Sequence, residues 1–130
     1  MRSHSIAIQG SLASFHELAA KHYFGNDIEP IYCQSFREVC SKIAANQADY
    51  GLIAIENKVA GSILLNYQLI ESFGLSIIGE TYLPVELQLL GKKGSVISEI
   101  REIISHPMAL AQCQQFLSGL DGVTVSEFRD

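Results

Sequence analysis

The stretch Asp49-Tyr-Gly-Leu-Ile-Ala-Ile-Glu-Asn-Lys-Val-Ala-Gly-Ser62 decides the fold class of this chain. Residues 52–55 would be apolar on both faces of an extended strand, which is typical of a central strand in a parallel sheet covered on both sides. Glu56 and Asn57 therefore follow at the carboxyl end of that strand, where open α/β sheets bind their ligands. The stretch predicts both a parallel sheet and a substrate site at its edge.

The end of the same stretch predicts the start of a helix. Gly61 allows a ligand to approach the backbone closely, and Ser62 is placed to cap a helix expected over residues 63–73. The first N–H groups of a helix lack partners and carry a partial positive charge, so they favour an anion such as a carboxylate. Asn57, Gly61 and Ser62 are therefore candidate substrate-binding residues, and Glu56 is a possible one that would orient the loop by accepting backbone N–H groups.

Strand patterns alternate with helix patterns through the first part of the chain. Strands are expected over residues 6–9, 28–33 and 50–55, and helices over residues 15–24, 36–45 and 63–73. This order predicts a βαβαβα unit with a parallel sheet. The capping boxes Ser14-Phe-His-Glu17 and Ser35-Phe-Arg-Glu38 support two helix starts, with each Ser serving the third N–H and each Glu reaching back to the cap. Gly25 and Gly74 are expected to end the first and third helices.

The pattern changes after a short strand expected over residues 75–78. Apolar and polar residues then alternate, as in a strand covered on one side, and Pro84 marks a crossover into a second lobe. The later elements expected are strands over residues 85–90, 102–105 and 123–128, a helical turn near 98–100 and a helix over 107–117. Residues 1–83 are predicted to form a first α/β lobe and residues 84–130 part of a second, with the C-terminal remainder absent, because the chain stops just after a strand.

The composition is that of an ordinary globular protein. The chain has 130 residues, of which 48% are hydrophobic and 18% charged, and its net charge of −5 comes without a basic cluster, so a nucleic-acid partner is not expected. No apolar run is long enough to span a membrane, and no signal-peptide core is present, so we expect no membrane partner and a cytoplasmic location. Cys33, Cys40 and Cys113 lack metal-ligand spacing and are expected to be reduced, buried thiols; we expect neither metal nor cofactor.

Four segments together resemble the prephenate dehydratase family. They are Ile8-Gln-Gly-Ser-Leu-Ala-Ser-Phe-His-Glu-Leu-Ala-Ala20, Ala54-Ile-Glu-Asn-Lys-Val-Ala-Gly-Ser62, Gly79-Glu80 with Leu83-Pro84, and Ser105-His-Pro-Met-Ala-Leu-Ala-Gln-Cys113. The resemblance covers nearly the whole chain. It implies a two-lobed α/β fold like that of type 2 periplasmic binding proteins, with prephenate bound in the cleft. It also implies a hydro-lyase reaction in L-phenylalanine biosynthesis, in which prephenate loses water and carbon dioxide to give phenylpyruvate, and a homo-oligomeric enzyme.

The chain departs from the family pattern at several positions. The family's first loop usually reads Gly-Pro-x-Gly-(Thr/Ser)-Phe-Ser, a Ser commonly follows Glu-Asn, and a Gln commonly follows His-Pro. The differing residues here are Ser11, Ala13, His16, Lys58 and Met108. The family's Thr-Arg-Phe motif, which contributes the catalytic hydroxyl and guanidinium, and its phenylalanine-sensing ACT domain are expected beyond Asp130. Residues 1–130 alone are therefore expected to be inactive.

The chemistry of prephenate explains the residue types at the predicted site. The substrate carries two carboxylates and a ring hydroxyl that must leave as water, so its site needs anion anchors and a proton donor. The helix starts at Ser14 and Ser62 supply N–H groups and hydroxyls, and Asn57 supplies an amide, all expected at one edge of the sheet. In the alternative interpretation, Ser14 and Ser62 are only helix caps and Asn57 only closes a turn.

Other candidates carry weaker signals. His16 is a possible proton donor, although an early helix position beside Glu17 also suits a solvated side chain. Ala13 is a possible pocket residue of the first loop, and His106 is expected to cap a helix. Three other functions stay open: an arogenate dehydratase, a non-catalytic small-carboxylate-binding module of the same fold, and an interaction or structural domain.

Overall fold

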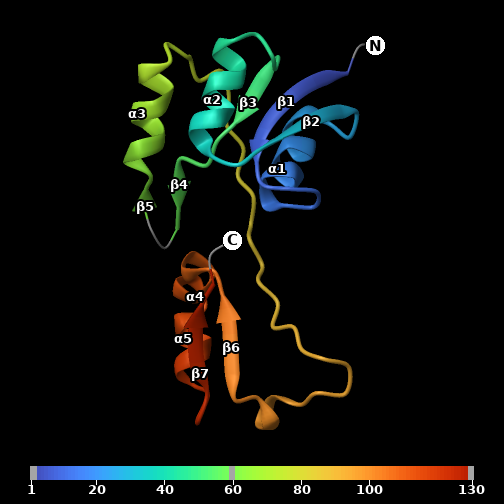
Figure 1. The fold of residues 1–130 in the computed structure, drawn as a ribbon, viewed down its shortest axis with the longest axis vertical. Coiled ribbons are helices and arrows are strands. Elements are labelled where there is room, and N and C mark those ends of the chain that lie inside the picture. Colours follow the sequence, from blue (N-terminus) through green and yellow to red (C-terminus); the bar gives the residue numbers. More distant parts are fainter. Residues whose placement is uncertain (1–2, 59–60, 129–130) are drawn as a thin grey trace. The chain divides into compact units, whose positions relative to one another are not determined.

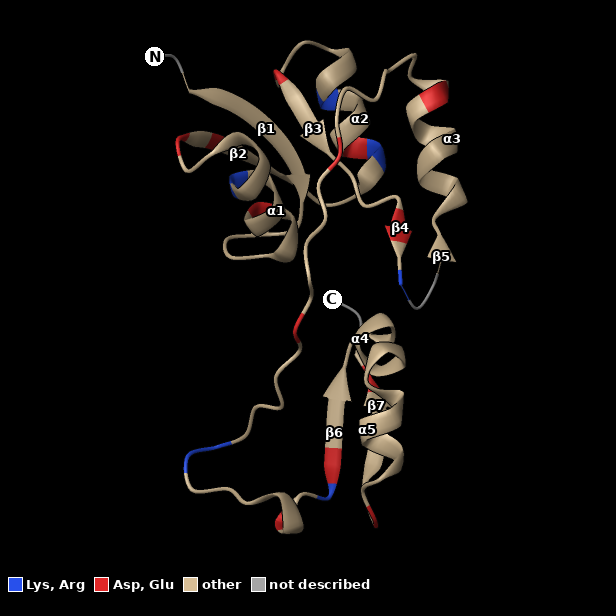
Figure 2. Cartoon of the chain, turned by 180° about the vertical axis from the view of Figure 1, so that it is seen from behind, with Lys and Arg blue, Asp and Glu red and all other residues tan. Residues whose placement is uncertain are grey.

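The computed structural model describes residues 3–58 and 61–128. The chain divides into two compact units, Met1–Val85 and Glu86–Asp130 (Figure 1). Lys and Arg are spread over separate elements of the described chain and form no basic stripe (Figure 2). No helix in the described ranges is long and apolar enough to cross a membrane.

The first unit alternates strands and helices as expected up to residue 52. Its elements are β1 (His4–Gln9), α1 (Phe15–Phe24), β2 (Ile28–Cys33), α2 (Phe36–Ala44), β3 (Tyr50–Leu52), β4 (Glu56–Asn57), β5 (Gly61–Ser62) and α3 (Leu64–Ser72). The order in the main sheet is β2-β1-β3, and β1 pairs in parallel with both neighbours. The prediction of a parallel α/β sheet is confirmed.

The central strand of the main sheet is β1. Ile6, Ala7 and Ile8 have no exposed surface, and alternate side chains point to opposite faces of the sheet. Ile6 and Ile8 pack with Ala20 of α1, whereas Ala7 packs with Val39 of α2, so each helix covers one face. The expectation that residues 50–55 form the central strand is wrong. β3 ends at Leu52 and pairs only with β1 among the described strands, so its residues are half-buried.

Both capping boxes form at the predicted residues. Ser14 Oγ accepts from the N–H of Glu17 at 3.3 Å, and Ser35 Oγ accepts from the N–H of Glu38 at 3.1 Å. The two carboxylates, however, accept from the residue before each cap, Ala13 and Gln34, and not from the cap itself. In the first box, the N–H of Ser14 instead donates to Ser11 O at 3.1 Å.

The predicted glycine stops are also confirmed. Gly25 has φ 91° and donates its N–H to Lys21 O. Gly74 has φ 66°, and the N–H of Leu75 donates to Ile70 O at 3.0 Å. Both are left-handed terminations that glycine adopts at little steric cost.

The segment between β3 and α3 differs from the prediction. Glu56–Asn57 and Gly61–Ser62 form an antiparallel two-stranded ribbon, which the N–H of Ile63 extends by donating to Ile55 O at 2.8 Å. The N-cap of α3 is Ile63, which makes no side-chain cap hydrogen bond, so the assignment of Ser62 as the cap is wrong. Strand pairing places Ser62 two residues before the helix, too early to serve as its cap.

Two predicted strands, over residues 75–78 and 85–90, are not formed. The described chain is irregular from residue 75 to residue 92. A strand needs a partner for its backbone hydrogen bonds, and alternation of side chains alone does not supply one. Gly79 nevertheless packs closely on α1, because an added Cβ would lie 2.0 Å from the Tyr23 hydroxyl oxygen.

The second unit is a small parallel α/β arrangement. It contains a short 3-10 helix (Ile97–Glu99), β6 (Glu102–Ser105), α4 (Pro107–Gln112), α5 (Gln114–Ser118) and β7 (Thr124–Glu127). β6 and β7 pair in parallel, from Glu102 opposite Thr124 to Ser105 opposite Glu127. The single helix expected over residues 107–117 is interrupted at Cys113. Pro107 occupies the first turn of α4, and His106 caps that helix as expected, with Nδ1 accepting from the N–H of Met108 at 3.1 Å.

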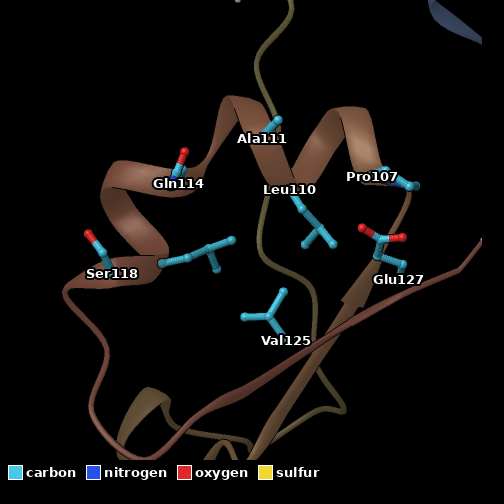
Figure 3. A pocket seen from close by; sticks show the side chains of 8 residues that line it. Pro107, Leu110, Ala111, Gln114, Ser118, Val125 and Glu127 are labelled. Atoms are coloured by element: carbon cyan, nitrogen blue, oxygen red, sulfur yellow. The ribbon is translucent and has the colours of Figure 1, made fainter.

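A shallow groove runs between the two short helices and β7 (Figure 3). Its lining residues are Pro107, Leu110, Ala111, Gln114, Leu117, Ser118, Val125 and Glu127. The lining is mainly apolar, with Glu127 as its acidic residue. No residue predicted to bind substrate lines this groove.

The contact between β3 and α2 leads to a stability prediction. A Cβ at Gly51 would lie 2.3 Å from Ile43 Cδ1 and 2.9 Å from Val39 Cγ1. We expect Gly51→Ala to destabilise the chain by about 1–3 kcal/mol, because the core around Val39 is already filled. Gly119→Ala is the control, since its nearest neighbour would be a carbonyl oxygen at an ordinary 3.5 Å. Urea denaturation would measure both, and equal midpoints would contradict the packing account.

Candidate functional site

Two loops leave the carboxyl ends of adjacent strands in the first unit. In the parallel register Ile8 lies opposite Leu52, so the loop after β1 and the segment after β3 start side by side. The connection from β1 leads to β2 on one side of β1, and the connection from β2 leads to β3 on the other side, so the strand order reverses between β1 and β3. Open α/β sheets bind ligands at such points. Both predicted substrate-binding segments begin here.

The loop between β1 and α1 is tightly hydrogen-bonded. Gly10 has φ 113° and donates its N–H to Cys33 O at 3.0 Å. Ala13 has φ 64°, a left-handed conformation that is uncommon for a residue with a side chain. Ala13 thus adopts a backbone shape that a glycine would take more readily, although its own Cβ must be accommodated. Ser14 is half-buried and caps α1, as described above.

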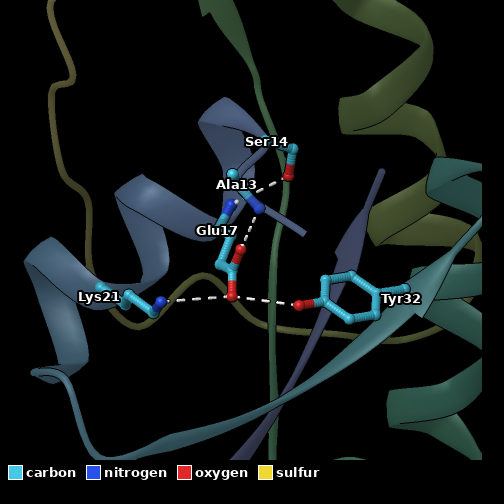
Figure 4. Close-up of polar contacts among 5 residues, drawn as sticks. All are labelled: Ala13, Ser14, Glu17, Lys21 and Tyr32. Carbon is cyan, nitrogen blue, oxygen red and sulfur yellow. Dashed lines mark hydrogen bonds and ion pairs between the residues drawn. The ribbon is translucent and has the colours of Figure 1, made fainter. Parts of the chain in front are cut away.

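Glu17 is the buried charged residue of this loop, with 3% of its surface exposed. Its carboxylate accepts from the N–H of Ala13 and from the Tyr32 hydroxyl at 3.1 Å, and lies 3.3 Å from Lys21 Nζ (Figure 4). The Ala13 N–H in particular lowers the pKa of Glu17, with further contributions from Tyr32 and Lys21. Burial and the neighbouring Glu17 raise the pKa of Tyr32. The site therefore holds a fixed negative charge beneath the loop.

Sequence reasoning identified Glu17 as part of a capping box but missed this network. The spacing to Lys21 is the i, i+4 pairing of a helix and could have been noticed. Tyr32 lies on β2, fifteen residues away, and no local pattern links it to Glu17.

His16 lies against the start of the second helix. Its ring centroid is 5.4 Å from that of Phe36, in an edge-to-face arrangement. Burial lowers the pKa of His16, so the neutral imidazole dominates at pH 7. The side chain is half-buried and is not the fully solvated group considered above. A neutral imidazole can still donate an N–H hydrogen bond, but it is a weak proton donor.

The second candidate segment is the β4–β5 ribbon. Its register places Glu56 opposite Ser62 and Asn57 opposite Gly61, so all four predicted residues lie on one two-stranded element. Asn57 is half-buried, whereas the side chains of Glu56 and Ser62 are exposed. Gly61 has φ 73°, and an added Cβ there would meet no atom of the described residues within 4 Å.

A buried amide fixes the helix that follows the ribbon. Asn66 is 3% exposed, and its side-chain N–H donates to Ala54 O at 2.6 Å. This hydrogen bond connects α3 to the chain between β3 and β4, so the segments that enter and leave the ribbon are held together. The sequence signal of this role is a single Asn on the apolar side of the predicted helix.

The helix starts offer fewer anion anchors than expected. The N–H of Glu17 is bonded to Ser14, and that of Ile63 to Ile55 O. Within the described residues, no acceptor serves the N–H groups of Phe15 and His16 in α1, or those of Leu64 and Leu65 in α3. These four donors, two at each helix start, are available to a carboxylate.

No cluster of three or more His, Cys, Asp or Glu side chains that could hold a metal ion occurs in the parts of the chain that the structure describes. Cys33, Cys40 and Cys113 are free thiols, the first two buried. Burial raises the pKa of Cys33 and of Cys40, so both thiols are protonated and unreactive at neutral pH.

The chain resembles known proteins along most of its length. The family model described as "Prephenate dehydratase" matches residues 6–130. Arogenate dehydratase/prephenate dehydratase 2 of Arabidopsis thaliana, a chloroplastic protein, is 36% identical over 115 residues, which are 88% of this chain and 30% of the relative. The bifunctional chorismate mutase/prephenate dehydratase of Escherichia coli (strain K12) is 34% identical over 116 residues, or 87% of this chain and 30% of the relative. The chain thus spans roughly a third of the length of these curated relatives.

Two solved structures are similar in fold. GqqA, described as a novel type of quorum quenching acylase, has a TM-score of 0.76 and 30% identity, covering 97% of this chain and 45% of its own. Prephenate dehydratase from Arthrobacter aurescens, in complex with L-Phe, has a TM-score of 0.69 and 20% identity, covering 95% of this chain and 42% of its own. The second likeness supports the fold alone. The match of the family model over residues 6–130 shows that the chain belongs to the prephenate dehydratase family.

Proposed function

We propose that the protein carrying this chain is a prephenate dehydratase, which removes water and carbon dioxide from prephenate to give phenylpyruvate in L-phenylalanine biosynthesis. The observation that carries the proposal is that two segments resembling the family's motifs begin side by side at the carboxyl ends of β1 and β3. An open α/β sheet binds its ligand at this position. The curated relatives from Arabidopsis thaliana and Escherichia coli support the same activity.

The available groups suit a substrate with two carboxylates. The N–H groups at the starts of α1 and α3 can donate hydrogen bonds to an anionic oxygen. On the ribbon, Asn57 adds an amide and Ser62 an exposed hydroxyl. Ser14 already accepts from Glu17, but its hydroxyl hydrogen can still donate to a ligand. Capping the helix and contacting the substrate are therefore compatible roles for Ser14. Gly61 and Ala13 provide backbone positions in the same two segments, and Glu56 and His16 complete the candidate set.

The wider organisation belongs to the same proposal. We assign residues 1–83 to the first α/β lobe and residues 84–130 to part of the second lobe of a domain like a type 2 periplasmic binding protein, which the resemblance to prephenate dehydratases supports. The proposal that the enzyme is a homo-oligomer rests on the same resemblance. A cytoplasmic location is supported by the two buried, unpaired thiols Cys33 and Cys40, which suit a reducing compartment.

One alternative substrate, arogenate, and one alternative reaction, acyl cleavage, are suggested by the similar proteins. The relative from Petunia hybrida is an arogenate dehydratase, and that from Arabidopsis thaliana is described as an arogenate dehydratase/prephenate dehydratase; arogenate has an amino group where prephenate has its side-chain keto group. The likeness to GqqA favours an acylase as a second candidate function. Apart from the Glu56 carboxylate, the candidate polar groups here can donate hydrogen bonds, and none of those described is an activated nucleophile, which fits a dehydratase better than acyl transfer.

The first functional prediction concerns substrate choice. The complete gene product should form phenylpyruvate from prephenate with a kcat/KM at least tenfold above its activity on arogenate or on an acylated quorum signal. Absorbance of phenylpyruvate and chromatography of the other products would measure the three rates in parallel. A preference for arogenate would reassign the substrate, and acyl cleavage without dehydration would reject the proposed reaction.

The second prediction concerns the ribbon residues. Asn57→Ala and Ser62→Ala should each lower kcat/KM for prephenate about 10- to 100-fold, the loss expected for a hydrogen bond to a charged group. Thermal stability should change little for Ser62→Ala, because its side chain is exposed. Ser72→Ala is the control, since Ser72 is bonded to Leu69 O at the far end of α3. Kinetics equal to the unaltered protein in both ribbon variants would remove them from the site.

A further inference from the structure

Two glutamates occupy the same position of the two capping boxes but have different surroundings. Each carboxylate accepts from the residue before its cap, Glu17 from Ala13 and Glu38 from Gln34 at 2.7 Å. Glu38 is half-buried, whereas Glu17 is 3% exposed and also contacts Tyr32 and Lys21. A helix cap alone does not require this burial, because the second box caps α2 without it.

The backbone beside Glu17 is also unusual. Ala13 has φ 64°, and Gln34, at the equivalent position of the other box, is not in the left-handed region. The left-handed conformation is disfavoured for a residue with a Cβ, so a contact must hold it. The N–H of Ala13 donates to the buried carboxylate, and a charged acceptor makes a stronger hydrogen bond than a neutral one (Figure 4).

The conformation of Ala13 determines what the loop can offer a ligand. The N–H of Ser14 is turned to Ser11 O, and that of Glu17 to Ser14 Oγ. With those donors occupied inside the loop, the N–H groups of Phe15 and His16 are left for an anion. A different conformation at Ala13 would move the cap and redirect these donors.

We propose that Glu17, held by Tyr32 and Lys21, is a positioning residue that fixes the β1–α1 loop in the shape that binds the substrate carboxylate. The identity of the ligand rests on the proposed function, whereas the contacts of Glu17 with the loop do not depend on it. Glu17 does not contact the substrate in this account. It acts through its hydrogen bond with Ala13. The hydrogen bond from Tyr32 on β2 to Glu17 connects the loop to the main sheet.

The test compares matched variants of the complete gene product. Glu17→Gln keeps the size of the side chain and removes its charge, and Glu38→Gln makes the same change in the other capping box. Glu17→Gln should raise KM for prephenate about tenfold or more, with kcat changed less than about threefold, because binding geometry is lost and no reacting group is removed. Glu38→Gln should leave both constants unchanged.

Amide hydrogen exchange at Ala13 provides a readout that needs no activity. The exchange rate of this N–H should rise about tenfold or more in Glu17→Gln and stay unchanged in Glu38→Gln. Since the pKa of Glu17 is lowered, protection of the Ala13 amide should persist through the ordinary carboxyl range and be lost as the pH falls through the lower pKa of the folded protein. Lys21 and Tyr32 are the neighbouring titratable groups, and the pKa of Tyr32 is raised, so its hydroxyl stays protonated over that range.

Each outcome decides one part of the proposal. If Glu17→Gln speeds exchange at Ala13 but leaves KM unchanged, Glu17 does not position the loop for the substrate. If exchange at Ala13 is unchanged in Glu17→Gln, Glu17 does not hold the loop conformation. If the unaltered protein does not convert prephenate, the proposed function fails, and exchange at Ala13 still decides what Glu17 does to the loop. If Glu17→Gln does not fold, Tyr32→Phe replaces it, with a rise in KM of about threefold expected from the loss of one contact and an unchanged KM counting against the proposal.

Discussion

The burial of β1 between two helices is the constraint on which the rest of the first unit depends. Ile6 and Ile8 are covered by α1 and Ala7 by α2, so the strand cannot shift by one residue without exchanging its two faces. The N–H of Asp49 donates to Ser5 O at 3.0 Å, and the N–H of Ser5 donates to the Asp49 carboxylate at 3.0 Å, so the start of β3 is fixed beside β1. The loops at the other ends of both strands are placed together as a result.

The site depends on polar contacts that hold flexible segments to this rigid sheet. Glu17 fixes the first loop through Ala13, and Asn66 fixes the second segment through Ala54 O at 2.6 Å. Both residues are 3% exposed, and no buried side-chain N or O atom in the described part of the chain lacks a hydrogen-bond partner, as the desolvation cost of buried polar groups requires. In both cases a polar residue from the first turn of a helix bonds to the loop or strand end before it.

Local signals predicted the elements whose determinants are local. The bounds of α1 and β2 follow from a capping box, a glycine stop and an apolar run, and the structure has them at the predicted residues. The strand expected over residues 85–90 failed because pairing is non-local and alternation does not reveal whether a partner exists. Ser62 was misassigned for a similar reason, since the pairing of Gly61–Ser62 with Glu56–Asn57 is a tertiary feature. The contact of Tyr32 with Glu17 also joins residues that no periodicity connects.

The central claim is that the loops after β1 and β3 form one substrate-binding edge. Binding of phenylpyruvate, the proposed product, followed by amide chemical shifts in NMR spectra tests it most directly. The account predicts that the signals of Phe15 and His16 shift together with those of Leu64 and Leu65, along one common saturation curve. Saturation at different concentrations, or shifts confined to residues 102–127, would contradict it.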